Sequence, residues 1–283
     1  MNKTDFLLRL KLERGIGYIK MLQIASQLDS EKVEAAQLKQ LDLPEKLIES
    51  SLQAFYNEKY EKIIDRIRKQ CSVISFFDDL YPKKLRQIYQ PPLILFVRGN
   101  TNLLKKPIAT IVGARQATNY SQVVIDELMP NLIKKYVIAS GLARGVDGMA
   151  HESALHHGGK TVAVVGNGIN HFYPAQNKFL QQEIVEKGLL ISEYLPDTPP
   201  KPFRFPERNR ILAGLSDIVI VTEAREKSGS LITANMALHE NRDVYAVPGP
   251  ITCDLSKGPN RLIEVGAIPI VDFKLEEPFQ NIE

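Results

Sequence analysis

From about residue 72 onward, short apolar runs rich in β-branched residues alternate with stretches of helical periodicity. This alternation predicts a mostly parallel, doubly wound α/β sheet, because parallel strands need long crossover connections that are usually helical. Several runs are continuously apolar, as in strands that are covered on both faces. The predicted strands are Val73–Phe77, Leu93–Val97, Ile108–Val112, Val137–Ala139, Thr161–Val165, Leu189–Ser192, Ile218–Val221, Val244–Val247 and Ile268–Val271, and the predicted helices between them are Tyr120–Lys135, Gly148–His157, Asn177–Lys187 and Ser230–Glu240.

In the first 68 residues, apolar side chains recur at helical spacing, as in Phe6-Leu7-Leu10. The step Gly15-Ile16-Gly17 between two helical stretches is similar to the hairpin of a helix-hairpin-helix unit, whose amide groups can face a DNA phosphate. A small helical bundle with a glycine turn is the alternative. We predict a helical domain over residues 1–68, an α/β domain over 72–275 and a short acidic tail over 276–283.

The bulk properties narrow the class of protein. The chain has 283 residues, a net charge of +3 and two cysteines, Cys71 and Cys253, with no ligand cluster around them. A disulfide framework or a zinc site is therefore not expected, and we predict no cofactor. The charged N-terminus does not fit a signal peptide, and no apolar run approaches the roughly 20 residues of a membrane helix, so we expect a cytoplasmic protein.

Glycine-rich turns follow three of the predicted core strands. In doubly wound sheets ligands bind at the carboxyl ends of the strands, where a glycine lets a ligand approach the backbone and the next helix offers unpaired N–H groups. Three such turns side by side predict an anion-binding shelf. The alternative is that the glycines serve turn geometry alone. The candidate phosphate-binding residues in these turns are Gly113, Arg115, Ser140, Gly141, Arg144, Gly145, Gly166 and Gly168.

The segment Lys201–Arg210 holds four cations and two aromatic residues but only one acid. Cations bind phosphates and aromatic side chains stack on unpaired bases, so this segment favours a single-stranded nucleic acid as ligand. Its first part belongs to a proline-rich stretch, Pro196–Pro206, that we interpret as a loop. The alternative is that its aromatic residues pack into the core and that an arginine pairs with an acid such as Glu223. The further candidate phosphate ligands are Lys178, Arg208, Asn209 and Arg210.

Two nucleotide-binding motifs are incomplete. Gly166–His171 begins like a dinucleotide fingerprint but lacks its third glycine, and Ser228-Gly229-Ser230 offers hydroxyls and amides to an anion but lacks the lysine of a P-loop. We interpret Asp147 as a helix cap in preference to a catalytic acid, and His151 as structural. These features favour a groove that binds over one that catalyses.

The chain resembles the DNA-processing protein A family, also called DprA or Smf, through motifs that occur in order. These are GARQAT (113–118), SGLARGVDGMAH (140–151), VVGNGINHFYP (164–174), SEYLPDTPPKPFRFPERNRILAGL (192–215), TEAREKSGSLITA (222–234) and VPGP (247–250). The resemblance covers about residues 72 to 275, and the first helices are less distinctly similar to that family's sterile-alpha-motif-like (SAM-like) domain.

The resemblance implies an extended Rossmann-like core that binds single-stranded DNA cooperatively and without strong sequence preference. It also implies protection of incoming DNA, displacement of single-strand-binding protein and loading of the RecA recombinase in natural transformation, all by a homodimer and without catalysis. In this sequence Arg115 occupies the arginine position of the first motif, and Arg144 occupies the basic position of the second.

This chain also departs from the family pattern. Some members carry a lysine where Ala175 stands, so the nearest cation here is Lys178, and many add a C-terminal winged-helix-like domain that we expect to be absent. The apolar pair Leu262-Ile263 suits a dimer surface, with core packing as the equal alternative.

Two other functions stay open. The first is a nucleotide-binding or nucleoside-monophosphate-cleaving Rossmann-like enzyme, although Lys227–Ala234 lacks two glycines and the glutamate of the loop that such enzymes carry. The second is an interaction scaffold that makes no DNA contact of its own.

Overall fold

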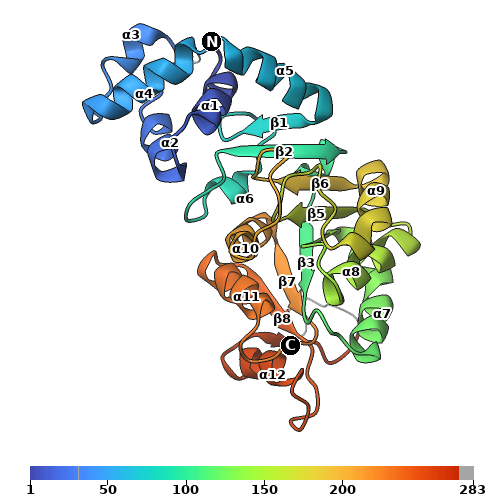
Figure 1. The fold of residues 1–283 in the computed structure, drawn as a ribbon. Helices are drawn as coiled ribbons and strands as arrows, with labels where there is room; N and C mark the ends of the chain where they lie inside the picture. Colours follow the sequence, from blue (N-terminus) through green and yellow to red (C-terminus); the bar gives the residue numbers. More distant parts are fainter. Residues whose placement is uncertain (31, 274–283) are drawn as a thin grey trace.

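The computed structural model describes residues 1–30 and 32–273, which form a nine-stranded sheet in the order β1-β2-β6-β5-β4-β3-β7-β8-β9 (Figure 1). The strands from β3 to β9 run parallel, and β2 is antiparallel to both β1 and β6. The predicted, mostly parallel Rossmann-like sheet is thus confirmed. The strands are β1 (Ser72–Ser75), β2 (Ile94–Gly99), β3 (Ile108–Val112), β4 (Val137–Ser140), β5 (Thr161–Val165), β6 (Leu189–Ser192), β7 (Ile218–Val221), β8 (Asp243–Ala246) and β9 (Ile268–Pro269).

Helices cover both faces of the sheet, which explains the continuously apolar strands. One face carries α7 (Asn119–Lys135), α8 (Val146–His156) and α9 (Lys178–Lys187), and the other carries α10 (Arg204–Leu215), α11 (Gly229–His239) and α12 (Lys257–Glu264) (Figure 1). The shorter elements are α6 (Lys83–Arg86), η1 (Thr101–Lys105) and η2 (Ala175–Asn177).

The order of the strands creates a switch point between β3 and β7. From β3 the chain builds β4, β5 and β6 in one direction, and α10 then carries it back to β7 on the other side of β3. Ligands of doubly wound sheets bind in the crevice at such a point, beyond the carboxyl ends of the strands.

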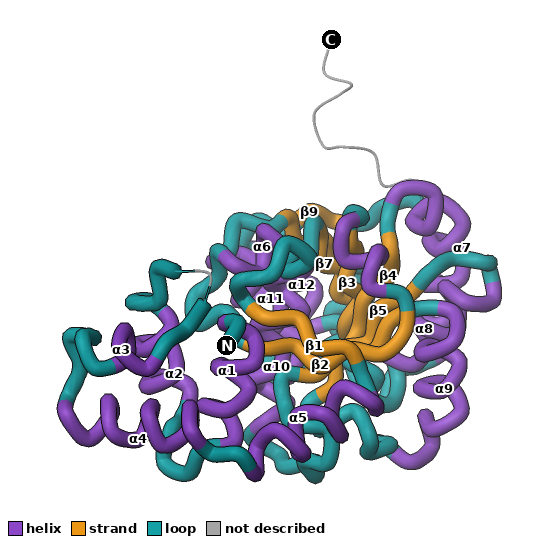
Figure 2. The backbone as a smooth tube through the Cα atoms, turned by 90° about the horizontal axis from the view of Figure 1, so that it is seen from above, coloured by secondary structure: helices purple, strands orange, loops and turns teal. Residues whose placement is uncertain are grey.

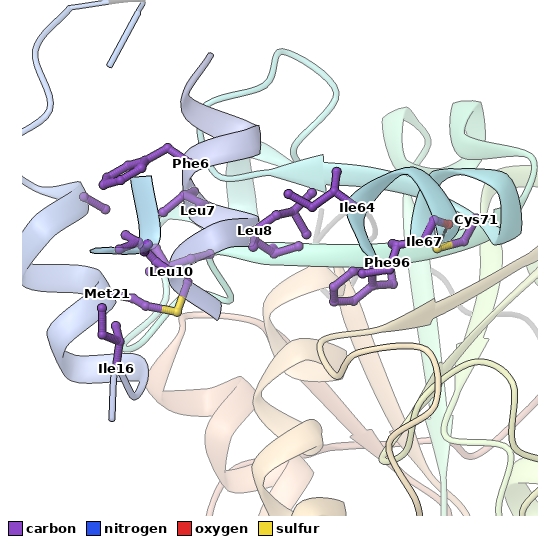
Figure 3. Packing of buried hydrophobic residues seen from close by; sticks show 14 of the residues in the cluster. Phe6, Leu7, Leu8, Leu10, Ile16, Met21, Ile64, Ile67, Cys71 and Phe96 are labelled. Carbon is purple, nitrogen blue, oxygen red and sulfur yellow. Dashed lines mark hydrogen bonds between the residues drawn. The ribbon is translucent and has the colours of Figure 1, made fainter. Parts of the chain in front are cut away.

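Five helices precede the sheet: α1 (Lys3–Leu12), α2 (Tyr18–Ala25), α3 (Ala35–Leu38), α4 (Glu45–Tyr56) and α5 (Lys59–Gln70). They lie beside β1 and β2, and Figure 3 shows their apolar side chains packed with Phe96 of β2 (Figures 2 and 3). The helical segment and this edge of the sheet therefore share one hydrophobic core. The division into residues 1–68 and 72–275 stays a prediction, and the predicted tail over 276–283 lies outside the described residues.

The interpretation of Pro196–Pro206 as a loop is wrong from Arg204 onward, because α10 begins there. Pro206 is compatible with this helix since it lies in the first turn, where a backbone N–H has no partner inside the helix. The helix is held by the apolar side chains of Ile211, Leu212 and Leu215, which pack on the sheet.

Candidate nucleic-acid interface

The three predicted glycine turns lie side by side, because β3, β4 and β5 are neighbours in the sheet. Three hollows of about 230, 290 and 190 Å³ open beyond these strand ends, and Arg115 and Phe205 line all three. We call their union the strand-end groove. It runs from Ser228 and Ser230, at the switch point, to Lys201.

The glycines of these turns are surrounded by the protein's own atoms. Gly145 adopts a φ of +73°, and a Cβ there would lie 2.2 Å from the carbonyl oxygen of Ala114. Added Cβ atoms would also meet Val146 at Gly113, Arg208 at Gly141, Phe205 at Gly166 and Pro196 at Gly168, all within 3 Å. The glycines therefore allow close packing between loops, which is the geometric alternative, and their contact with phosphate stays a prediction.

Arginine and aromatic side chains meet at the middle of the groove. Arg115 is exposed, and its guanidinium lies 6.0 Å from the centre of the Phe205 ring. That ring lies 5.2 Å from the ring of Tyr173. Arg144 is also exposed on the groove wall, and neither arginine forms an ion pair with another described residue. The groove thus offers uncompensated positive charge next to aromatic faces.

Lys178 lies at the edge of this groove, in the first turn of α9. Its ammonium is 5.4 Å from the centre of the Phe172 ring, which lines the groove. Because Phe172 and Tyr173 are each about two-fifths exposed, both rings are accessible to a ligand.

Arg208 and Asn209 lie beneath the groove and hold its floor together. Arg208 is 4% exposed, and its Nη1 donates to the carbonyl oxygens of Gly141, at 2.7 Å, and Val164. Asn209 donates from its amide to the Gly229 carbonyl at 3.1 Å. Both side chains are thus engaged by the protein itself, which makes them supports of the groove in this structure.

Arg210 lies on the opposite side of α10, away from the other predicted phosphate ligands. Its guanidinium donates to both carboxylate oxygens of Glu193, at 2.7 and 2.8 Å. The expected pairing of one of these arginines with an acid is thus confirmed, but the acid is Glu193. Glu223, the acid given as an example, instead accepts hydrogen bonds from Thr118 and Ser121.

Asp147 and His151, near the floor of the groove, have pKa values shifted by burial. Burial raises the pKa of Asp147, against the effect of Arg208 and of the Ala143 N–H, which donates to the carboxylate at 3.2 Å. Burial lowers the pKa of His151 to about 3, so the ring is neutral at pH 7. His151 meets the Thr161 hydroxyl at 2.6 Å inside the core, as its structural interpretation expects.

The switch point adds residues that were not among the predicted site residues. Ser228, Gly229 and Ser230 line the groove where α11 begins, and no side chain caps this helix at Ser228. Its first N–H groups and the positive end of its dipole therefore favour an anion. The Ser228-Gly229-Ser230 sequence could have predicted this part of the site. It was not included because it lacks the lysine of a P-loop.

In residues 1–30 and 32–273, no helix combines the length and the apolar character that a bilayer span demands.

Comparison with known proteins places the chain in a family. The family model described as DNA recombination-mediator protein A matches residues 49–277. The curated DNA processing protein DprA of Streptococcus pneumoniae is 45% identical over 218 residues, which are 76% of this chain and 77% of that protein.

Two solved structures are also similar. The X-ray structure of DprA from Streptococcus pneumoniae has a TM-score of 0.86 at 36% identity and covers 96% of each chain. A structure of DNA processing protein A from Helicobacter pylori, described for its single-stranded DNA binding mode, has a TM-score of 0.65 at 35% identity and covers 72% of this chain and 92% of that one. With its sheet, its ordered motifs and these matches, the chain belongs to the DNA recombination-mediator protein A family, whose curated members carry the names DprA and Smf.

Proposed function

We propose that this chain binds single-stranded DNA along the strand-end groove. The observation that carries the proposal is Arg115, an exposed cation at the junction of three hollows and beside the Phe205 ring. The Helicobacter pylori relative, described for its single-stranded DNA binding, supports this ligand. Unpaired bases offer faces that stack on aromatic rings, whereas the bases of a duplex are already stacked.

The groove chemistry favours a strand of any sequence. Arg115 and Arg144 provide charge for phosphates, and Phe172 and Tyr173 provide faces for bases. Neither kind of contact reads the edges of the bases, so affinity arises from charge and stacking.

Arg115→Ala is expected to weaken the binding of all oligonucleotide sequences alike, because a phosphate contact carries no sequence information. The slope of log affinity against log salt should fall in magnitude by about 0.7, the value for one contact with a single strand. Fluorescence anisotropy with labelled oligothymidine over a salt series measures this slope.

Arg66→Ala is the matched control, since Arg66 is an exposed arginine on α5 outside the groove. It should leave affinity and slope as in the unmodified chain. An unchanged slope in Arg115→Ala would assign Arg115 a structural role. If the unmodified chain does not bind oligothymidine at low salt, the proposal is wrong.

We further propose that the chain protects incoming DNA, displaces single-strand-binding protein and loads RecA recombinase in natural transformation. The description of the family as a recombination mediator supports this role. Strand exchange by RecA on DNA coated with single-strand-binding protein should begin sooner with the unmodified chain than with Arg115→Ala. Equal lags would contradict the loading role.

We also propose a homodimer. Ile263 is partly buried on α12, and Val265, directly after that helix, is 60% exposed, which suits an apolar contact. Leu262, the other predicted contact, is 4% exposed and packs in the core, so it lies beneath that surface and does not form part of it.

Sedimentation equilibrium tests the homodimer. The unmodified chain should give twice the chain mass, and a folded Ile263→Arg variant should sediment as one chain. A variant that stays dimeric would remove the assignment.

We propose that the groove binds DNA and does not catalyse the cleavage of nucleoside monophosphates. The two buried carboxylates beside it, Asp147 and Glu223, already accept hydrogen bonds from the protein, which ties them to its own loops. Incubation with nucleoside monophosphates should release no base, and released base would favour the enzyme.

A further inference from the structure

A second cavity, of about 680 Å³, lies between the N-terminal helices and the sheet. Its wall includes Ile16 and Gly17, from the hairpin between α1 and α2, and Tyr18, the first residue of α2. Tyr194 and Leu195, which follow β6, also line it. Its volume is in the range of small-molecule sites, about 300–1,000 Å³, and such sites often lie between domains. The hairpin that the sequence singled out therefore borders a cavity large enough for a ligand.

Helix α10 separates this inter-domain cavity from the strand-end groove. Arg204, Glu207 and Arg210 recur at helical spacing and line the cavity, whereas Phe205 and Arg208 line the groove. Pro206, in the first turn, lines both.

The acids of the cavity are already engaged. Glu193 accepts both hydrogen bonds of Arg210, and Glu207 accepts from the Tyr194 hydroxyl at 2.8 Å. Lys11, on α1, lines the same cavity. Among residues 1–30 and 32–273, it makes neither a hydrogen bond nor an ion pair.

The charge on Lys11 is unfavourable in the free protein. Desolvation lowers the pKa of its ammonium and Arg210 lowers it further, while Glu193 raises it. Nη1 of Arg210 is buried and has no hydrogen-bond partner among the described residues. A half-buried cation in the cavity wall and an unsatisfied donor on Arg210, which lines the same cavity, both favour an anionic ligand there.

The remaining wall is suited to a flat apolar group. Met21, Leu93 and Met236 line the cavity beside the Tyr18 and Tyr194 rings. Methionine and tyrosine contact aromatic systems favourably. Charge at one point and aromatic or sulfur-bearing walls elsewhere are the features that a nucleotide needs for its phosphate and its base.

We propose that the inter-domain cavity is a second nucleotide site, in which Lys11 binds the phosphate and the Tyr18–Tyr194 side receives the base. The nucleotide is either a unit of the bound strand or a free nucleoside monophosphate. The first source rests on the proposed single-stranded DNA binding, and the second does not. Either source gives the N-terminal helices a direct role in ligand binding.

Lys11→Met tests the site because it removes the charge while keeping the length of the side chain. The probes are dTMP, inorganic phosphate and oligothymidine, measured by calorimetric titration and by thermal shift. Lys46→Met is the matched control, since Lys46 is an exposed lysine on α4 that lies outside the cavity. Without ligand, Lys11→Met should melt at or above the temperature of the unmodified chain, because it relieves a desolvated charge.

The expected result is that Lys11→Met weakens nucleotide binding about 10-fold or more, the effect of one lost charged hydrogen bond. A loss with dTMP identifies a free nucleotide. A loss with oligothymidine alone, with the salt slope reduced by about 0.7, identifies a unit of the strand. Lys46→Met should match the unmodified chain with every probe.

Three outcomes would overturn the proposal. In the first, dTMP and oligothymidine bind Lys11→Met as tightly as the unmodified chain. In the second, inorganic phosphate binds as tightly as dTMP, so the walls do not receive a base. In the third, Lys11→Met melts well below the unmodified chain and keeps its affinity, which makes Lys11 a structural residue. If oligothymidine fails to bind the unmodified chain while dTMP binding needs Lys11, the groove proposal fails and the cavity proposal stands.

Discussion

Arg208→Ala is expected to lower the free energy of unfolding by about 3–5 kcal/mol, the usual cost of removing one partner from a buried charged network. The carbonyl oxygens of Gly141 and Val164 would lose their shared donor. The buried Asp147 would lose the positive charge that offsets its desolvation. Urea denaturation followed by circular dichroism measures the loss, which should lower the melting temperature by roughly 5–8 °C.

Two further variants serve as controls for Arg208→Ala. Arg66→Ala removes an exposed arginine from α5 and should change the stability by less than about 0.5 kcal/mol. Arg208→Lys should recover little, because a compact ammonium does not reproduce the fixed geometry of the guanidinium. If Arg208→Ala costs no more than Arg66→Ala, Arg208 does not hold the floor of the groove.

Gly145→Ala is expected to cost about 3–5 kcal/mol, which combines backbone strain with steric overlap. Gly145 combines a φ of +73° with a ψ of −131°, a region in which glycine alone is comfortable. Its missing Cβ would lie 2.2 Å from the Ala114 carbonyl oxygen, so the Gly113–Arg115 turn would have to move. Oligothymidine affinity should fall together with stability, because that turn carries Arg115.

Gly158→Ala separates strain from overlap. Gly145 precedes helix α8 and Gly158 follows it with a φ of +77°, but apart from its chain neighbours no atom of the described residues lies within 4 Å of the missing Cβ of Gly158. It should therefore cost only about 1 kcal/mol and leave DNA affinity intact. If urea denaturation gives equal losses of unfolding free energy for Gly145→Ala and Gly158→Ala, the overlap with the Ala114 carbonyl oxygen adds nothing to the cost.

The strands and their glycine turns were predictable because their signals are local. Runs such as Ile108–Val112 and Thr161–Val165 are apolar except for one threonine each, and the observed strands have the same bounds. Their order in the sheet, which places three turns side by side, follows from the short right-handed connections of alternating strands and helices. The shelf of turns could thus be predicted without coordinates.

The first turn of α10 was not predictable from the same signals. Its sequence, Arg204-Phe205-Pro206, is rich in features of loops, and the apolar residues that hold the helix come later. Propensity is a weak guide when burial against a sheet decides the structure. The helix in turn separates Arg208, which is buried, from Arg210, which pairs with Glu193 on the other side of α10.

By itself, the sequence determined the alternating architecture, the three strand-end turns and the family, because each depends on local order along the chain. Only the tertiary structure decided what each cation does. Arg115 remains exposed in the groove, and Arg208 is buried beneath it. Lys11 lines the same cavity as Arg204 and Arg210, although 193 and 199 residues separate it from them in the sequence. The physical reason is that the role of a charge depends on its solvent and its neighbours, and packing between distant segments sets both.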